Sequence, residues 1–212
     1  MGPQELPFLV LSIVSAYLIG AIPTAYMFGR ALKGLDIREH GSKNMGATNA
    51  FRVLGKGPGI AVLLIDVLKG VVPTVWVARA FGLDDPLALV LIGLAAVAGH
   101  NWTIFLGFKG GKGVATSLGM LIGLAVQMAG MRIVLGLTLA VWLLLFLTFG
   151  YVSLASICAS IVFPVLTTAF NAPFPIKATA IFLCIFIVLR HKANISRLMQ
   201  GKENRVKLPF HK

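Results

Sequence analysis

The sequence carries little charge, and very little of that charge is acidic. Of the 212 residues only 12% are charged and 58% are hydrophobic, whereas about 25% of the residues in soluble domains are charged. Lys and Arg number 19 against 7 Asp and Glu, which gives a formal net charge of +12. Such a chain buries its apolar surface in lipid, so we expect one integral membrane domain over residues 1–212. Nucleic-acid binding is an alternative explanation of the basic balance, but apolar runs interrupt the basic residues, which disfavours it.

Several catalytic and metal-binding patterns are missing. No histidine is followed, after four intervening residues, by the aspartate of a His-x4-Asp acyltransferase, and there is no G-x-S-x-G nucleophile elbow. Near the polar segments described below, only Asp36, Glu39 and Glu203 supply carboxylates, too few and too scattered for a paired Mg²⁺ site. Cys158 and Cys184 lie inside apolar runs, so we expect reduced thiols that form neither a disulfide nor a metal pair.

Long apolar runs dominate what is present. A helix needs roughly 17–25 apolar residues to cross the hydrocarbon core of a bilayer. Seven runs approach or meet this length, which predicts an all-α, polytopic protein of about seven transmembrane helices. We place the helices at residues 6–29, 59–77, 87–106, 114–130, 133–149, 154–170 and 176–189.

The basic residues predict the orientation of these helices. Cytoplasmic loops are enriched in Lys and Arg, and most of the 19 basic residues fall in the first loop, the third loop and the tail. This distribution puts the N-terminus outside and the C-terminus in the cytoplasm. The residues concerned are Arg30, Lys33, Arg38, Lys43, Arg52 and Lys56, then Lys109 and Lys112, then Arg190, Lys192, Arg197, Lys202, Arg205, Lys207 and Lys212.

The first of three polar segments on this side has the sequence GSKNMGATN at residues 41–49 and is followed by an arginine. Small residues let the backbone curl, and Ser, Asn and Thr add hydrogen-bond donors, so the segment suits an anion cradle. An alternative interpretation is that Thr48 or Asn49 caps a short helix. The candidate phosphate ligands are Ser42, Asn44, Thr48, Asn49 and Arg52.

The second segment, GFKGGKG at residues 107–113, precedes a predicted helix that starts near Val114. Glycines before a helix N-terminus, together with lysines, are the ingredients of a phosphate site. The segment is not a Walker A loop, because Lys112 is followed by Gly113. The alternative is a charged helix end whose lysines extend to the membrane surface. The candidate ligands are Gly110, Gly111 and Lys112.

The third segment, RHKANISRLMQGKE at residues 190–203, is predicted to be a helix that leaves the membrane. Taken alone, it is also typical of a basic surface helix that binds anionic headgroups.

Two charged residues lie within the second predicted span. Asp66 and Lys69 are three positions apart and share one helix face, so we expect an ion pair that neutralises both charges. A direct role in the site is the alternative. His100 is expected to be a hydrogen-bonded residue of the helix bundle, and Gly119 and Gly123 are candidates for a close approach of two helices.

Together the segments GSKNMGATN, DVLKG, GHNWTIFLGFKGGKGVAT and RHKANISRLMQGKE closely resemble the signature segments of the bacterial acyl-phosphate:glycerol-3-phosphate acyltransferase family (PlsY type). The resemblance covers essentially the whole chain. It implies a seven-helix enzyme of the bacterial cytoplasmic (inner) membrane, with its active site facing the cytoplasm and with no metal or other cofactor.

The activity that the resemblance implies is transfer of a fatty acyl group from acyl-phosphate to the 1-hydroxyl of sn-glycerol 3-phosphate. The products are 1-acyl-sn-glycerol 3-phosphate (lysophosphatidic acid) and inorganic phosphate, in phospholipid biosynthesis. The implied partners are the two substrates, membrane lipids and a peripheral phosphate acyltransferase that supplies acyl-phosphate; nucleic acid is not among them.

By position, the resemblance assigns the residues of the first two segments to the site as substrate- or phosphate-binding groups. It adds His191, Asn194 and Ser153 as catalytic residues and Glu203 as a binding residue. Two positions depart from the family pattern: Lys43 replaces a usual Gly, and Thr103 replaces a usual Pro. Lys43 either strengthens phosphate binding or restricts a turn that needs positive φ, and Thr103 changes the kink near the site.

Two other functions compete with this one. A small anion or organophosphate transporter also has basic residues at helix ends, but its polar residues typically lie at mid-membrane in paired inverted halves. Here the polar residues gather at one surface. A CDP-alcohol phosphotransferase would need an aspartate-rich metal site, which the sequence lacks.

Overall fold

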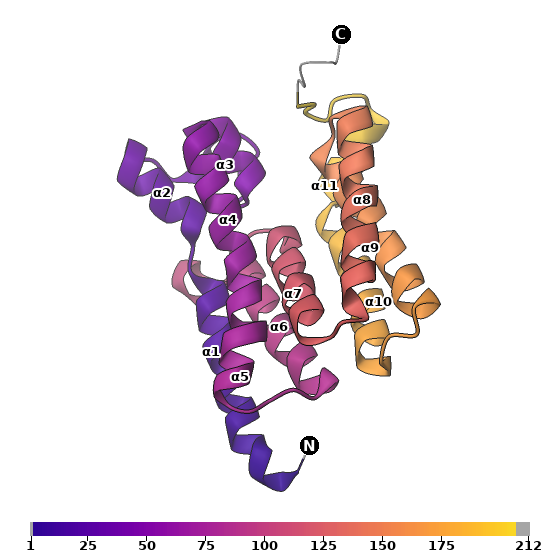
Figure 1. Ribbon diagram of the computed structural model, residues 1–212. Helices are drawn as coiled ribbons and strands as arrows, with labels where there is room; N and C mark the ends of the chain where they lie inside the picture. The colour runs from indigo at the N-terminus through magenta and orange to yellow at the C-terminus, as the bar shows by residue number, and fades with distance from the viewer. Residues whose placement is uncertain (1, 207–212) are drawn as a thin grey trace. The chain divides into compact units, whose positions relative to one another are not determined.

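The computed structural model describes residues 2–206, so Lys207 and Lys212 of the basic tail lie outside the described residues. All regular secondary structure in this part of the chain is helical (Figure 1). The chain divides into two compact units, Met1–Gln127 and Met128–Lys212. A single membrane domain over the whole chain remains a prediction, and each unit is described by itself below.

The first predicted span is interrupted near its middle. The chain enters unit 1 through the short turn η1 (Pro3–Glu5) and forms α1 (Leu6–Ala21) and α2 (Thr24–Lys33). The break falls at Ile22 and Pro23, because proline has no N–H to continue the helical hydrogen bonds. The span predicted over residues 6–29 is confirmed as the candidate span Leu6–Lys33, with a break at Ile22 and Pro23 that the sequence analysis did not predict.

The first polar segment folds at the end of α2. The segment follows the turn η2 (Ile37–Glu39) and runs into the helix α3 (Ala47–Leu54). In Figure 1, α2 and α3 lie at the end of unit 1 that is remote from the N-terminus.

The second span returns toward the other end of unit 1 as α4 (Lys56–Val72), the π-helical turn η3 (Pro73–Val77) and α5 (Ala78–Ala80). Pro73 accounts for the π-helical turn, because its missing N–H disrupts the regular pattern of hydrogen bonds. Thr74 partly compensates: its hydroxyl donates to the Gly70 carbonyl at 2.8 Å.

Unit 1 is completed by α6 (Pro86–Asn101), the turn η4 (Ile104–Leu106) and α7 (Val114–Gln127). Helix α6 packs against α1, and α7 packs against α4. At Gly119 a side chain would collide with the Val67 carbonyl oxygen of α4. The predicted close approach of two helices at Gly119 is therefore confirmed.

The described part of unit 2, up to residue 206, contains four helices and a returning tail. The helices are α8 (Met131–Phe149), α9 (Val152–Ala169), α10 (Phe174–Arg190) and α11 (Lys192–Met199). Helix α9 packs against both α8 and α10, and α11 is bent by 59° from α10. The tail is held where α8 meets α9, because Val206 N donates to the Gly150 carbonyl at 2.9 Å.

Each of the seven predicted spans corresponds to an apolar helix. Within residues 2–206, five helical segments are long and apolar enough to cross a membrane, and the bent pair of α10 and α11 makes a sixth. Helix α7 is apolar but shorter, with 14 residues. The prediction of a polytopic, all-α membrane protein is therefore confirmed, whereas the orientation of the termini stays a prediction.

Candidate functional site

Asn49 organises the first polar segment. Its side chain is buried, with 1% of its surface exposed. The amide nitrogen donates to the carbonyls of Asn44, His40 and Ile37 at 2.9, 3.1 and 3.2 Å. Its oxygen Oδ1 accepts from Ser42 N at 2.8 Å. The loop before α3 is thus wrapped around one amide, whose hydrogen-bonding groups are all engaged within the protein.

Asn49 and Thr48 do not cap α3. The N-cap residue is Gly46, and its N–H is instead bonded to Asn44 Oδ1 at 2.9 Å. The capping interpretation of the sequence is therefore wrong. Ser42 and Thr48 are exposed, and Asn44 is half-buried, so these polar groups line the accessible side of the loop.

Lys43 adopts a left-handed backbone conformation with φ +58°. Residues other than glycine rarely adopt such a conformation. The family's usual glycine would fit this turn without strain, so the sequence-based expectation of a turn with positive φ is confirmed.

Charged residues flank this loop. Arg38 Nη2 donates to Asp36 Oδ2 at 2.6 Å, and this hydrogen bond, despite the burial of Asp36, lowers the pKa of the carboxyl to about 2. Asp36 is thus an anion already matched to a cation. Arg52, in the last turn of α3, is exposed. Arg52 is the arginine of the first segment that the structure leaves accessible to an external phosphate.

The second polar segment folds back onto the end of α6. Gly110 N donates to the Asn101 carbonyl at 3.1 Å, and Gly111 N donates to the His100 carbonyl at 3.0 Å. A side chain at Gly111 would collide with His100 Nε2, so the loop requires glycine at this position. Lys112 follows directly and is half-buried just before α7.

The first and second segments meet in unit 1. Leu106, in the turn before the glycine loop, packs against the buried cluster that contains Met45 and Ala50 of the first segment. The two loops that the sequence singled out as phosphate-binding are therefore brought to the same end of unit 1. The predicted phosphate ligands among their cations are the exposed Arg52 and the half-buried Lys112, and the loops also carry the exposed Lys43 and Lys109.

Glu203 organises the third segment within unit 2. Its Oε1 accepts from Asn194 Nδ2 at 2.6 Å and from Ser153 Oγ at 2.9 Å. Its Oε2 accepts from Arg197 Nε at 2.7 Å. Burial acts to raise the pKa of the Glu203 carboxyl, but the hydrogen bonds from Asn194, Arg197 and Ser153 outweigh it, so the pKa is lowered. A carboxylate engaged in this way orients its donors.

His191 is 4% exposed at the junction of α10 and α11. Its Nδ1 lies 2.8 Å from the Ile187 carbonyl oxygen. Because a carbonyl only accepts hydrogen bonds, Nδ1 carries the proton in this contact. When the imidazole is neutral, Nε2 is therefore the nitrogen that can accept a proton.

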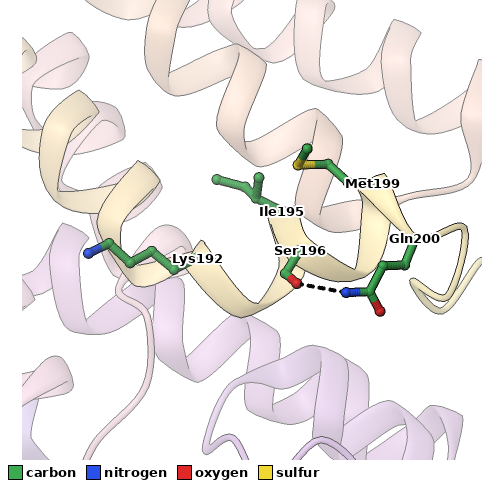
Figure 2. A pocket seen from close by; sticks show the side chains of 5 residues that line it. All are labelled: Lys192, Ile195, Ser196, Met199 and Gln200. Atoms are coloured by element: carbon green, nitrogen blue, oxygen red, sulfur yellow. Dashed lines mark hydrogen bonds between the residues drawn. The ribbon is translucent and has the colours of Figure 1, made fainter.

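A shallow groove of about 380 Å³ runs along the outer face of α11. Its lining side chains are Lys192, Ile195, Ser196, Met199 and Gln200, with Gln200 Nε2 donating to Ser196 Oγ at 3.2 Å (Figure 2). None of the predicted site residues lines this groove, so we do not assign it to the site.

Several contributors were not predicted from the sequence. Arg197 was counted only as a basic residue of the tail, yet it is an ion-pair partner of Glu203 at 2.7 Å. His100 was expected to be an ordinary bundle residue, yet its ring lies against the glycine loop. The only available signal for Arg197 was its place in a helix shortly before a lone carboxylate.

Known proteins resemble this chain along nearly its whole length. A family model described as glycerol-3-phosphate acyltransferase matches residues 10–201. The chain is 44% identical over 197 residues to a glycerol-3-phosphate acyltransferase of Fusobacterium nucleatum, covering 92% of this chain and 96% of the relative. It is 45% identical over 199 residues to one of Geobacter sulfurreducens, covering 94% and 97%.

Two solved structures share the fold. One is a crystal structure of PlsY (YgiH), an integral membrane glycerol 3-phosphate acyltransferase, in its glycerol 3-phosphate form. The TM-score is 0.85 at 40% identity, covering 94% of this chain and 96% of that chain. The second is the lysophosphatidic acid form, with a TM-score of 0.82 at 39% identity, covering 94% and 95%.

Proposed function

Because the chain belongs to the glycerol-3-phosphate acyltransferase family, we propose that it transfers a fatty acyl group from acyl-phosphate to the 1-hydroxyl of sn-glycerol 3-phosphate. The products are 1-acyl-sn-glycerol 3-phosphate (lysophosphatidic acid) and inorganic phosphate. The observation that carries this proposal is the meeting of two donor-rich, cationic loops at one end of unit 1, where Leu106 packs against the cluster that contains Met45 and Ala50.

In this proposal the two loops hold phosphate. Arg52 offers a planar fork for two phosphate oxygens, and Lys112 offers a mobile point charge. The exposed or half-buried side chains of Ser42, Asn44 and Thr48 add neutral donors. Gly110 and Gly111 contribute by holding the loop against α6, because their N–H groups donate to the Asn101 and His100 carbonyls. Asn49 contributes by shaping the loop, because its amide is fully engaged by the protein.

The chemistry needs no nucleophilic side chain, because acyl-phosphate is an activated mixed anhydride. The 1-hydroxyl oxygen of glycerol 3-phosphate attacks the acyl carbonyl carbon, a new ester C–O bond forms, and the C–O bond to phosphate breaks. The electron pair leaves with inorganic phosphate, whose developing charge the cations stabilise. Holding the two substrates in line can lower the barrier by roughly 7–11 kcal/mol.

The hydroxyl proton needs an acceptor. His191 is the protein candidate, because the contact of Nδ1 with the Ile187 carbonyl makes Nε2 the proton-accepting atom of the neutral ring. A phosphate oxygen of a substrate is the alternative. Asn194 and Ser153 are the other proposed catalytic residues. Glu203 fixes the orientation of both side chains through the hydrogen bonds that it accepts from them.

The cellular setting follows from the same proposal. The positive charge of the loops supports a site on the cytoplasmic face of the bacterial inner membrane. A peripheral phosphate acyltransferase supplies acyl-phosphate there, and the product enters phospholipid synthesis.

The test is a turnover assay in mild detergent without divalent metal. Purified protein is mixed with glycerol 3-phosphate and either palmitoyl-phosphate or palmitoyl-CoA, and both the acylated product and released phosphate are measured. We expect turnover with palmitoyl-phosphate, strongly reduced by Lys112→Ala and retained by Lys109→Ala, whose lysine lies in the same loop and is exposed. Turnover with palmitoyl-CoA alone would overturn the proposed donor.

A pH–rate profile separates the two proton acceptors. If His191 accepts the proton, His191→Gln abolishes the rise of kcat with pH that titration of an imidazole produces. A profile unchanged by the substitution would assign the proton to a substrate phosphate.

A further inference from the structure

A buried polar cluster lies beneath the glycine loop of unit 1. Asp66 and Lys69 of α4 are 1% and 3% exposed, and Lys69 Nζ donates to Asp66 Oδ1 at 2.6 Å. The ion pair expected from the sequence is thus confirmed. His100 of α6 completes the cluster, with Nδ1 3.7 Å from the same carboxylate oxygen.

Stability does not account for this cluster. Burying two ions costs several kcal/mol each, and a packed apolar pair of similar volume is often as stable or more stable. In addition, Asp66 Oδ2 is buried without a hydrogen-bond partner among the described residues. A polar arrangement that leaves a carboxylate oxygen unsatisfied calls for an explanation other than folding energy.

The histidine connects the carboxylate to the loop. One ring nitrogen, Nδ1, faces Asp66, and the other, Nε2, lies where a side chain at Gly111 would be. The backbone of the same histidine holds Gly111 through the 3.0 Å hydrogen bond to its carbonyl. The position of His100 therefore limits where Gly111, and the adjacent Lys112, can lie.

The far side of the loop is held by the same turn of α4. Thr116, in the first turn of α7, donates its hydroxyl to the Asp66 carbonyl at 3.0 Å. Lys112 thus lies between two held positions, Gly111 and Thr116. Gly111 is connected to Asp66 through His100, and Thr116 through its hydrogen bond to the Asp66 carbonyl.

From this geometry we infer that Asp66, Lys69 and His100 are positioning residues for Lys112. The Asp66 carboxylate, neutralised by Lys69, orients the His100 ring, and the ring together with the Thr116 hydrogen bond fixes the backbone on either side of Lys112. The inference rests on the proposed role of Lys112 as a phosphate ligand. None of the three residues needs to touch substrate.

The deciding variant is the double substitution Asp66→Asn/Lys69→Met. It removes both charges together. A single substitution would leave one buried ion unpaired and destabilise the protein, so that a loss of activity could come from unfolding. A purely structural ion pair predicts near wild-type kinetics for this variant once it is folded. The positioning role instead predicts a KM for glycerol 3-phosphate raised by roughly ten- to hundredfold, the size expected of a small misplacement of a binding group.

A thermodynamic cycle shows whether the effect passes through Lys112. Kinetics are measured for the double variant, for Lys112→Ala and for the two combined. We expect the combination to raise KM no further than Lys112→Ala alone, because a positioning effect disappears with the group positioned. If the combined variant shows the product of the two separate increases in KM, the positioning role is overturned and the phosphate role stands. If Lys112→Ala has wild-type kinetics, the phosphate role is overturned as well.

Two further substitutions test the part played by the ring. His100→Asn keeps a nitrogen near the Nδ1 position that faces Asp66, whereas His100→Gln places one near Nε2, toward the loop. We expect His100→Asn to retain the lower KM, and the reverse order would overturn the link from Asp66 to the ring. Thr74→Val is the matched control, since Thr74 is also buried in unit 1 and bonds only within its own helix turn; its KM should equal that of the wild type.

Discussion

Replacing Asn49 by aspartate exchanges a nitrogen for an oxygen with almost no change of shape. In the native loop that nitrogen donates toward the carbonyls of Ile37, His40 and Asn44, at 2.9–3.2 Å. A carboxylate oxygen at the same place would face three acceptors without a proton to share. The substitution thus changes the hydrogen bonding and the charge of the side chain, whereas its volume is kept.

The cost follows from the two protons that are lost. Each net hydrogen bond contributes about 1 kcal/mol, and buried acceptors left unpaired add to the loss. The new carboxylate is also placed in a site that is 1% exposed, which costs several kcal/mol more without a partner cation. We expect Asn49→Asp to destabilise the protein by about 4–6 kcal/mol, which corresponds to a fall in Tm of roughly 10–20 °C.

Thermal unfolding in detergent and the KM for glycerol 3-phosphate are the two measurements. Asn171→Asp is the matched control, because it makes the same chemical change at an exposed residue of unit 2. Acidification from about pH 8 to about pH 5 should reduce the difference in Tm between Asn49→Asp and the wild type, because protonation of the buried carboxyl restores one hydrogen-bond donor. A variant with wild-type Tm and KM would refute the view that Asn49 shapes the cradle loop.

Three further predictions concern single side chains. Lys43→Gly should stabilise the protein by about 0.5–1 kcal/mol in thermal unfolding, because glycine adopts the positive φ without strain; a destabilised variant would contradict this. Thr103→Val should cost about 1–3 kcal/mol by leaving the Ala21 carbonyl without the Thr103 hydroxyl, whereas Thr103→Ser should be near neutral; equal losses would assign the effect to packing. Glu203→Gln should be less stable than the wild type at neutral pH, and this difference in stability should shrink as the pH falls below about 4.5. The Glu203 pKa is lowered on folding, so its contribution is present above the ordinary value and is lost as the pH falls through the lowered one. A gap between variant and wild type that persists at low pH would contradict the assignment.

Hydrophobicity was sufficient to predict the membrane helices, because lipid imposes length and apolarity on every span. It did not reveal the break at Pro23, because the segment Leu6–Lys33 still has the length and apolarity of a span when it contains a proline. The structure shows why the break is tolerated: the Thr103 hydroxyl donates to the Ala21 carbonyl at the end of α1. That contact joins residues far apart in the chain and has no local signature.

The candidate site was predicted by residue type but not by role. Asn49 and Glu203 stand among polar residues that suit phosphate binding, yet both are occupied by protein partners. A sequence shows that an amide or a carboxylate is present, but only the fold shows whether its hydrogen-bonding groups are already engaged. The role of His100 was missed for a similar reason, since its two neighbours, Asp66 and Gly111, belong to other parts of the chain.

Calorimetric titration of glycerol 3-phosphate into the purified protein tests the phosphate-binding role of the glycine loop most directly. Lys112→Met removes the cation but keeps most of the volume of the side chain, and Lys109→Met is its control in the same loop. Loss of one charge-assisted contact to phosphate, about 1.5–3 kcal/mol, predicts a Kd raised by roughly 10- to 100-fold for Lys112→Met. Lys109→Met should leave the Kd unchanged. Equal affinities of wild type and Lys112→Met would contradict a phosphate site at this loop.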